Sequence, residues 1–86
     1  MKRYETNFTM TPVLSDEQAK GCVSKFRTII ENLGCRVVLE ENWGLRNEGW
    51  KALFEYETDN LPSTDIDIAF KRDERILKFE TYRLST

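Results

Sequence analysis

The feature that most constrains the fold is an amphipathic stretch between Ser15 and Gly34, in which apolar residues recur every three or four positions. This spacing predicts a helix of about five turns with one buried face. Ser15 can cap the first turn and Gln18 can complete a capping box, while Gly34 can end the helix in a left-handed conformation. The apolar face consists of Ala19, Cys22, Val23, Phe26, Ile29, Ile30 and Leu33.

Segments of alternating polarity surround this helix and predict β-strands with one buried face. Asn47, Glu48 and Gly49 predict a short hairpin loop between the second and third strands. Gly44, inside the second strand, indicates a bulge or a close backbone approach. The four predicted strands span residues 4–10, 35–46, 50–57 and 76–84.

The segment 63–72 fits either a strand or a helix. Ile66, Ile68 and Phe70 alternate as in a strand, whereas the residues from Pro62 onward resemble a helix start. A fifth strand would leave one helix to cover a whole face of the sheet, so we favour a second helix with Ile66 and Phe70 on the sheet. The fold class is then α+β, a ferredoxin-like split βαβ fold with a four-stranded antiparallel sheet and two helices on one face. Right-handed crossovers place the first and third strands in its centre.

The 86 residues predict a single domain, residues 1–86. Thirteen basic and 15 acidic residues give a net charge of −2, so binding to nucleic acid would depend on a local patch of cations. The sequence contains no apolar run of membrane-spanning length, and its first residues lack the apolar core of a signal peptide. We therefore expect a cytoplasmic protein without a membrane partner, monomeric when isolated.

Residue types that support catalysis or metal binding are scarce in this sequence. It has no histidine, which removes the usual general base and the commonest metal ligand. Cys22 and Cys35 lack the spacing of a zinc or redox motif and are expected to be buried thiols. A glycine-rich phosphate loop is also missing. The sequence predicts a protein that is not an enzyme and uses no metal or cofactor.

Four separated motifs stand out in the sequence. They are Arg3-Tyr4-Glu5-Thr6, Thr11-Pro12-Val13-Leu14-Ser15, Glu40-Glu41-Asn42-Trp43-Gly44-Leu45-Arg46, and Arg72-Asp73-Glu74-Arg75 followed by Phe79 and Thr81. Together they resemble bacterial small-subunit ribosomal protein six, in the form found in Bacteroidetes-type bacteria. The resemblance implies the same split βαβ fold and a structural constituent of the small ribosomal subunit without catalytic activity. It further implies binding to the central domain of small-subunit ribosomal RNA (rRNA), together with small-subunit ribosomal protein eighteen.

Three features differ from the pattern of that family. Gly49 and Trp50 follow Arg46 almost at once, where the family continues into a long basic hairpin. Residues 61–67 depart from the usual second-helix sequence, and the family's C-terminal tail is missing after Thr86. A shortened hairpin still closes a sheet, so we expect the fold to survive. The alternative function is an engineered or diverged scaffold, or a protein-interaction module, that keeps the fold but has lost RNA binding.

Seven basic residues are the candidate RNA-binding residues, because guanidinium and ammonium groups bind phosphate oxygens. We expect Lys2 and Arg3, at the start of the first strand, to lie near Arg72 and Arg75 and to form one local cluster. The competing interpretation is that Arg72 and Arg75 belong to a solvated turn that is paired internally. The seven residues are Lys2, Arg3, Arg46, Lys71, Arg72, Arg75 and Arg83.

Trp43 and Trp50 flank the hairpin and could stack on unpaired bases. Core packing or a cross-strand aromatic contact is favoured for both, because they alternate with polar neighbours. The sheet face away from the helices is expected to be solvated, with Leu53 as its main apolar residue, and does not resemble an aromatic RNA-reading sheet. A partner could instead add along an exposed strand edge. The polar residues of that face are Asn7, Thr9, Lys51, Glu55, Lys78 and Glu80.

Overall fold

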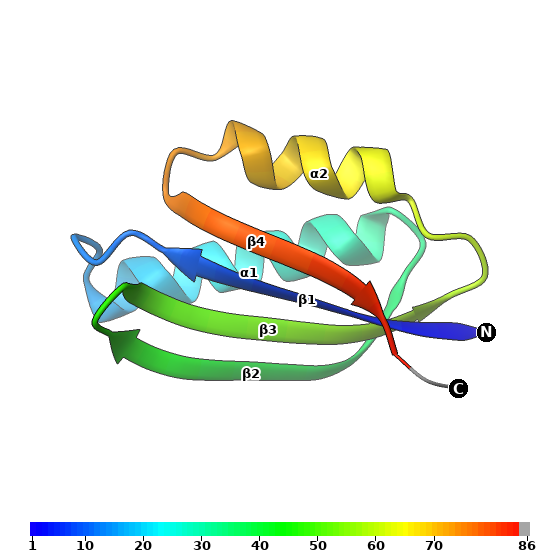
Figure 1. Cartoon of the computed structure of the whole chain (residues 1–86), viewed down its shortest axis with the longest axis horizontal. Helices are drawn as coiled ribbons and strands as arrows, with labels where there is room; N and C mark the ends of the chain where they lie inside the picture. The colour runs from blue at the N-terminus through cyan, green and yellow to red at the C-terminus, as the bar shows by residue number, and fades with distance from the viewer. Residues whose placement is uncertain (85–86) are drawn as a thin grey trace.

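The computed structural model describes residues 1–84 and contains one four-stranded sheet with two helices on the same side of it (Figure 1). The strands are antiparallel and lie in the order β2-β3-β1-β4. The predicted ferredoxin-like split βαβ fold, with the first and third strands in the centre, is therefore confirmed. In chain order the elements are β1 (Lys2–Met10), α1 (Asp16–Asn32), β2 (Arg36–Arg46), β3 (Gly49–Thr58), α2 (Ser63–Arg72) and β4 (Ile76–Arg83).

Helix α1 begins and ends at the predicted capping residues. The backbone N–H of Gln18 donates to Ser15 Oγ at 3.1 Å, and the N–H of Ser15 donates to Gln18 Oε1 at 2.8 Å. This capping box satisfies two backbone amides that a helix start leaves free. Leu33 is the C-cap, and Gly34 follows with a φ of 89°, the left-handed conformation that ends many helices. The buried side chains of α1 are Ala19, Cys22, Val23, Phe26 and Ile30.

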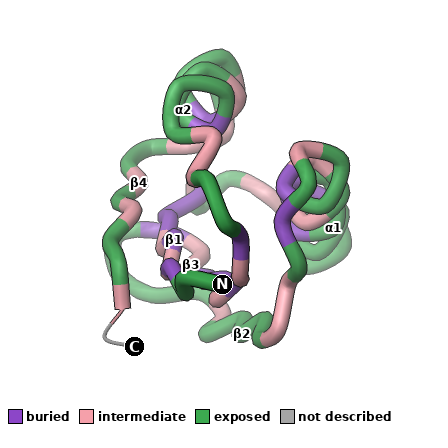
Figure 2. Tube along the Cα trace, turned by 90° about the vertical axis from the view of Figure 1, so that its right-hand side faces the viewer, coloured by how far each residue is buried: buried purple, intermediate pink, exposed green. Residues whose placement is uncertain are grey.

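Phenylalanine rings from four elements form the centre of the core. Phe26 of α1 stacks on Phe70 of α2 with ring centroids 4.1 Å apart, and Phe8 of β1 lies 5.1 Å from Phe70. Phe79 of β4 also stacks on Phe70, at 5.1 Å. Figure 2 shows the buried residues concentrated in the central strands and along the sides of the helices that face them. These contacts hold both helices against one face of the sheet.

A chain of hydroxyl groups crosses three strands within this core. Thr6 of β1 is fully buried, and its Oγ1 lies 2.8 Å from Tyr56 Oη on β3 and 2.8 Å from Thr81 Oγ1 on β4. Burial raises the pKa of Tyr56, which keeps the phenol neutral and able to donate. Because a buried hydroxyl without a partner is costly, these bonds favour one register of β3, β1 and β4.

The segment 63–72 is a helix, as predicted. Ile66 and Phe70 of α2 are each 1% exposed and face the sheet, whereas Ile68 is 42% exposed. Two of the three alternating apolar residues thus fall on one helical face, and the third lies on the solvent side.

The hairpin between β2 and β3 consists of Asn47 and Glu48. Gly49 starts β3 with a φ of 142°, and a Cβ added there would clash with the carbonyl oxygen of Met10. The close approach of β3 to the end of β1 therefore requires glycine at this position.

Cys22 and Cys35 are free thiols and both are buried, as predicted. Burial raises the pKa of both thiols, so they stay protonated at neutral pH. Across residues 1–84, neither helix has the length and apolar character needed to cross a membrane.

Candidate nucleic-acid interface

The predicted cations fall into separate groups at opposite ends of the sheet. β1 and β4 run antiparallel, which places Arg83, at the end of β4, beside the start of β1 that carries Lys2 and Arg3. Arg72 ends α2 and Arg75 lies in the turn before β4. Both are at the other end of the sheet, about 25 Å away at 3.3 Å per residue of strand. The predicted single cluster is therefore wrong, because antiparallel pairing brings the start of β1 next to the end of β4.

The amino-end group consists of Lys2, Arg3, Arg36 and Arg83. Arg3 Nη2 donates to Glu57 Oε2 at 3.1 Å, and Arg36 Nη1 lies 4.0 Å from Glu57 Oε1, so two guanidiniums share one carboxylate. Strand alternation directs Arg3 and Arg36 to the face away from the helices, and Lys2 and Arg83 to the helix side. Sequence reasoning missed Arg36, because its position across Glu57 from Arg3 follows from a strand register that the residue pattern does not reveal.

The far-end group consists of Lys71, Arg72 and Arg75. Arg75 is paired internally: its Nε and Nη2 donate to the two oxygens of Asp73 at 2.9 and 2.7 Å. Lys25 of α1 donates to the same carboxylate at 2.9 Å. The bonds from Arg75, and then those from Lys25, hold the pKa of Asp73 well below its usual range. The internally paired turn is thus correct for Arg75, whereas Lys71 and Arg72 are exposed to solvent.

Arg46 lies apart from both groups, at the end of edge strand β2 on the side of the sheet opposite β4. In the adjacent hairpin, Glu48 accepts hydrogen bonds from Lys78 at 2.7 Å and from Lys51 at 3.0 Å. These two bonds, the one from Lys78 first, lower the pKa of Glu48 to about 2. Lys51 and Lys78 therefore share a single carboxylate, which offsets only one of their two positive charges, and Arg46 stays exposed beside them.

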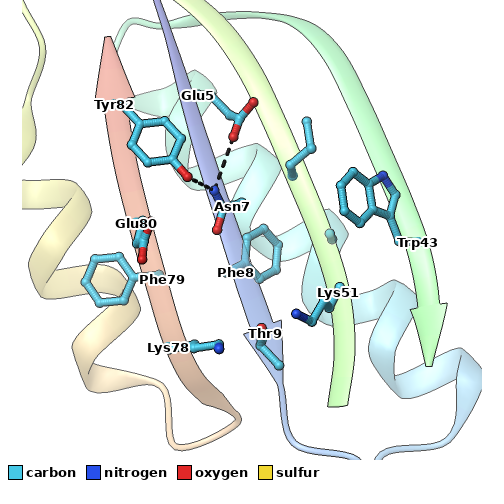
Figure 3. Close-up of a pocket in the computed structure, with 12 residues that line it drawn as sticks. Glu5, Asn7, Phe8, Thr9, Trp43, Lys51, Lys78, Phe79, Glu80 and Tyr82 are labelled. Carbon is cyan, nitrogen blue, oxygen red and sulfur yellow. Dashed lines mark hydrogen bonds between the residues drawn. The ribbon is translucent and has the colours of Figure 1, made fainter. Parts of the chain in front are cut away.

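The face of the sheet opposite the helices is less uniformly solvated than predicted. Leu53, in its middle, is only 7% exposed, whereas Trp43 is 51% exposed and Tyr82 is 45% exposed. All three line a shallow hollow of about 330 Å³ on this face, whose wall Figure 3 shows. Asn7 Nδ2 lies in the hollow and donates to Tyr82 Oη at 2.7 Å and to Glu5 Oε2 at 3.1 Å.

The two tryptophans have different surroundings. Trp43 is not packed in the core, so that prediction is wrong. The strand register of β2 shifts between Val37 and Leu39, which places Glu41 on the outer face, and Trp43, two residues further on, lies on the same face and donates from Nε1 to Glu41 Oε1 at 3.1 Å. Trp50 is half-buried against the core, as predicted, and its Nε1 donates to the carbonyl oxygen of Leu14 at 3.1 Å.

The exposed cations and aromatic rings of the sheet can bind anions and planar or cationic groups. Within the described chain, no three His, Cys, Asp or Glu side chains come together in a way that could hold a metal ion. Exposed arginines and lysines can bind phosphate oxygens, and exposed aromatic rings can stack on planar groups.

Comparison with known proteins identifies a single family over nearly the whole chain. The model of the family described as Ribosomal protein S6 matches residues 3–83. A relative from Parabacteroides distasonis, named small ribosomal subunit protein bS6, is 40% identical, and the match covers 96% of this chain and 78% of the relative. A protein of the same name from Bacteroides fragilis is 38% identical, with 98% and 82% covered.

A solved structure shares the fold. The crystal structure of 30S ribosomal protein S6 from Thermotoga maritima superposes with a TM-score of 0.91, and the match covers 96% of this chain and 87% of that one. The sequences are 20% identical over this match, so the comparison supports the architecture and says nothing about individual contact residues.

Proposed function

Because this chain belongs to the ribosomal protein S6 family, we propose that it binds the central domain of small-subunit rRNA together with small-subunit ribosomal protein eighteen. It does so as a structural constituent of the small ribosomal subunit in the cytoplasm, and it acts by binding rather than by catalysis. The observation that carries the proposal is the match of the whole fold, from β1 to β4, to one ribosomal family.

The amino-end group is proposed as the main phosphate-binding surface. Lys2, Arg3, Arg36 and Arg83 come from three strands and meet at one end of the sheet, with Glu57 between two of them. Lys71 and Arg72, together with Arg46 on the other edge, are proposed to make further contacts at the far end. Arg75 acts on the RNA only through the turn that it shapes, because Asp73 occupies its guanidinium.

The experiment is a titration of a labelled fragment of the rRNA central domain at two salt concentrations, with and without protein eighteen. We expect salt-dependent binding that tightens when protein eighteen is present. A Lys2→Ala and Arg83→Ala double variant should bind at least fivefold more weakly and show a smaller salt dependence. The slope of log K against log salt should fall by about 0.9 for each lost contact to a duplex phosphate.

Two further variants calibrate this result. Lys71→Ala with Arg72→Ala tests the far end, and we expect a smaller loss of affinity there. Lys20→Ala is the matched control, because Lys20 lies exposed on α1 and pairs with Asp16 of the same helix. A folded wild-type chain that binds neither the RNA nor protein eighteen would contradict the proposal and favour a scaffold that has kept the fold alone.

A further inference from the structure

Two lysines converge on one point of the outer face of the sheet, the face opposite the helices. Lys51 of β3 and Lys78 of β4 stand in the same row of the sheet, on either side of Thr9 of β1. Figure 3 shows their ammonium groups pointing toward each other across β1. Because like charges held close together repel, this arrangement needs an anion between the two groups.

Glu48 supplies that anion from the hairpin between β2 and β3. Its Oε1 accepts a hydrogen bond from Lys51 Nζ at 3.0 Å, and its Oε2 accepts one from Lys78 Nζ at 2.7 Å. The side chain of Glu48 is 56% exposed and belongs to a loop of two residues, so it can rotate away without any change in the sheet. An anion from solution can therefore reach the same two ammonium groups.

The charge around this point stays positive when Glu48 is counted. Arg46 is exposed beside the hairpin, so that three cations surround one carboxylate. Arg46, Lys51 and Glu48 line an open groove of about 720 Å³, in which Glu48 is the one acidic residue of the described lining. Glu41 and Glu80, further along the same face, lie outside that lining. The groove therefore favours an anionic ligand.

An exposed indole stands beside these cations. Trp43 lines the same groove as Arg46 and Lys51 and is 51% exposed. Its Nε1 donates to Glu41 Oε1 at 3.1 Å, which holds the ring in one orientation. An aromatic ring next to cations suits a nucleotide of single-stranded RNA, because the base can stack on the ring while the phosphate binds the cations.

We propose that Lys51 and Lys78 form a phosphate-binding site, that Glu48 occupies this site in the free protein, and that a phosphate of unpaired RNA displaces Glu48 on binding. Two phosphate oxygens take the places of the two carboxylate oxygens, because both groups accept charge-assisted hydrogen bonds from ammonium. Arg46 and Trp43 then bind the adjoining nucleotide, the first at its phosphate and the second at its base. The inference rests on the proposed function, in which RNA is the ligand, and adds a site that the protein's own side chain covers.

The test is an NMR titration of the intact ¹⁵N-labelled chain with tetrauridylate, at low salt and pH 7. We expect the backbone amides of Asn47 and Glu48 and the indole N–H of Trp43 to shift. The indole N–H of Trp50 serves as an internal control, since it is bonded to Leu14 away from this groove.

A matched pair of variants tests the role of Glu48. Glu48→Gln should tighten the binding of tetrauridylate at least fivefold, because a neutral amide competes less well for the two ammonium groups. Glu55→Gln removes the same charge from the same face, four residues along β3 from Lys51, and should change the affinity less than twofold.

A second comparison separates occupation of the site from general charge. In a chain that also carries Lys51→Ala and Lys78→Ala, the site is removed, so Glu48→Gln should change the affinity less than twofold. Arg46→Ala should weaken the binding of tetrauridylate at least threefold. Trp43→Ala should do the same but leave the binding of inorganic phosphate within twofold, because inorganic phosphate has no base to stack.

Three outcomes would overturn the inference. One is equal tightening by Glu48→Gln and Glu55→Gln, which would show general attraction without a site. Another is an effect of Glu48→Gln that persists when both lysines are replaced. The third is a shift of the groove signals with tetra-arginine and none with tetrauridylate, which would assign the groove to a basic polypeptide.

The same variants keep this inference and the proposed function apart. A chain that binds tetrauridylate with the expected response to Glu48→Gln, but does not bind the central-domain fragment, would contradict the proposed function alone. A chain that binds the fragment while its groove signals stay unmoved would contradict this inference alone.

Discussion

At the scale of single residues, Gly49 is the position where the backbone allows the least change. Gly49→Ala places a Cβ against the carbonyl oxygen of Met10 at a φ that L-residues rarely adopt. We expect a loss of about 2 kcal/mol or more in the free energy of unfolding, measured by urea denaturation. Gly21→Ala is the control, because open space surrounds this helical glycine, and it should stabilise by about 0.5 to 1 kcal/mol. Equal effects of the two substitutions would contradict this account.

Asp73 is the residue whose charge matters most for the turn before β4. Its side chain is 6% exposed and accepts bonds from Arg75 and Lys25, so Asp73→Asn should cost about 2 kcal/mol at pH 7. Because folding lowers the pKa of Asp73, its contribution is present above the unfolded-state pKa of about 3.9 and is lost as the pH falls below it. Urea denaturation from pH 7 down to about one unit below that unfolded-state pKa should show the variant losing less stability than the wild type. Parallel curves would contradict the role assigned to this carboxylate.

At the scale of elements, α2 offers an internal comparison between two isoleucines. Ile66 is 1% exposed and Ile68 is 42% exposed on the same helix. Ile66→Ala should reduce the free energy of unfolding by about 2 to 4 kcal/mol, because it leaves a cavity between α2 and the sheet. Ile68→Ala should cost less than about 1 kcal/mol. Chemical denaturation of both variants checks this, and similar losses would mean that α2 does not pack as described.

The elements themselves could be predicted from the sequence, because each has a local signal. The period of the apolar residues and the Ser15 and Gly34 caps defined α1, and counting sheet faces was enough to identify α2. Contacts between residues distant in the sequence have no such local signal. The residue pattern does not show that Lys2 and Arg75 lie at opposite ends of the sheet, because this follows from the antiparallel pairing of β1 with β4. Alternation also does not reveal the side on which Trp43 lies, because the register shift of β2 between Val37 and Leu39 moves the residues that follow it to the other face.

The candidate site was partly predictable for the same reason. The types of residue that bind phosphate are visible in any sequence, but the match of Arg3 and Arg36 across Glu57 depends on two strand registers. The hollow beside Trp43 was missed altogether, because its lining comes from all four strands. Short-range patterns therefore defined the elements, and long-range register defined the site.

At the scale of the whole molecule, the two thiols report on global unfolding. Cys22 and Cys35 are 0% and 5% exposed and come from α1 and from the segment that leads into β2. We expect an aromatic disulfide reagent to modify both thiols at one common slow rate in the native protein. That rate should rise with urea in parallel with the unfolding measured by circular dichroism. Rapid modification of one thiol alone would instead reveal local opening of its element.

The separation of the cation groups has a consequence for assembly. The molecule is 36 Å along its longest axis, and the sheet holds Lys2 and Arg83 at one end and Lys71 and Arg72 at the other. If both ends hold phosphate, the protein is a rigid bivalent crosslinker between two RNA segments about 25 Å apart, the separation of the two cation groups along the strands. Binding at the first end then raises the effective concentration of the second end near its RNA segment. Weak contacts at the two ends therefore give a stable complex only where the RNA holds both segments at that spacing. A chain of this size would thus bind most tightly to the RNA conformation in which the spacing of the two segments matches the separation of its two cation groups, and would favour that conformation.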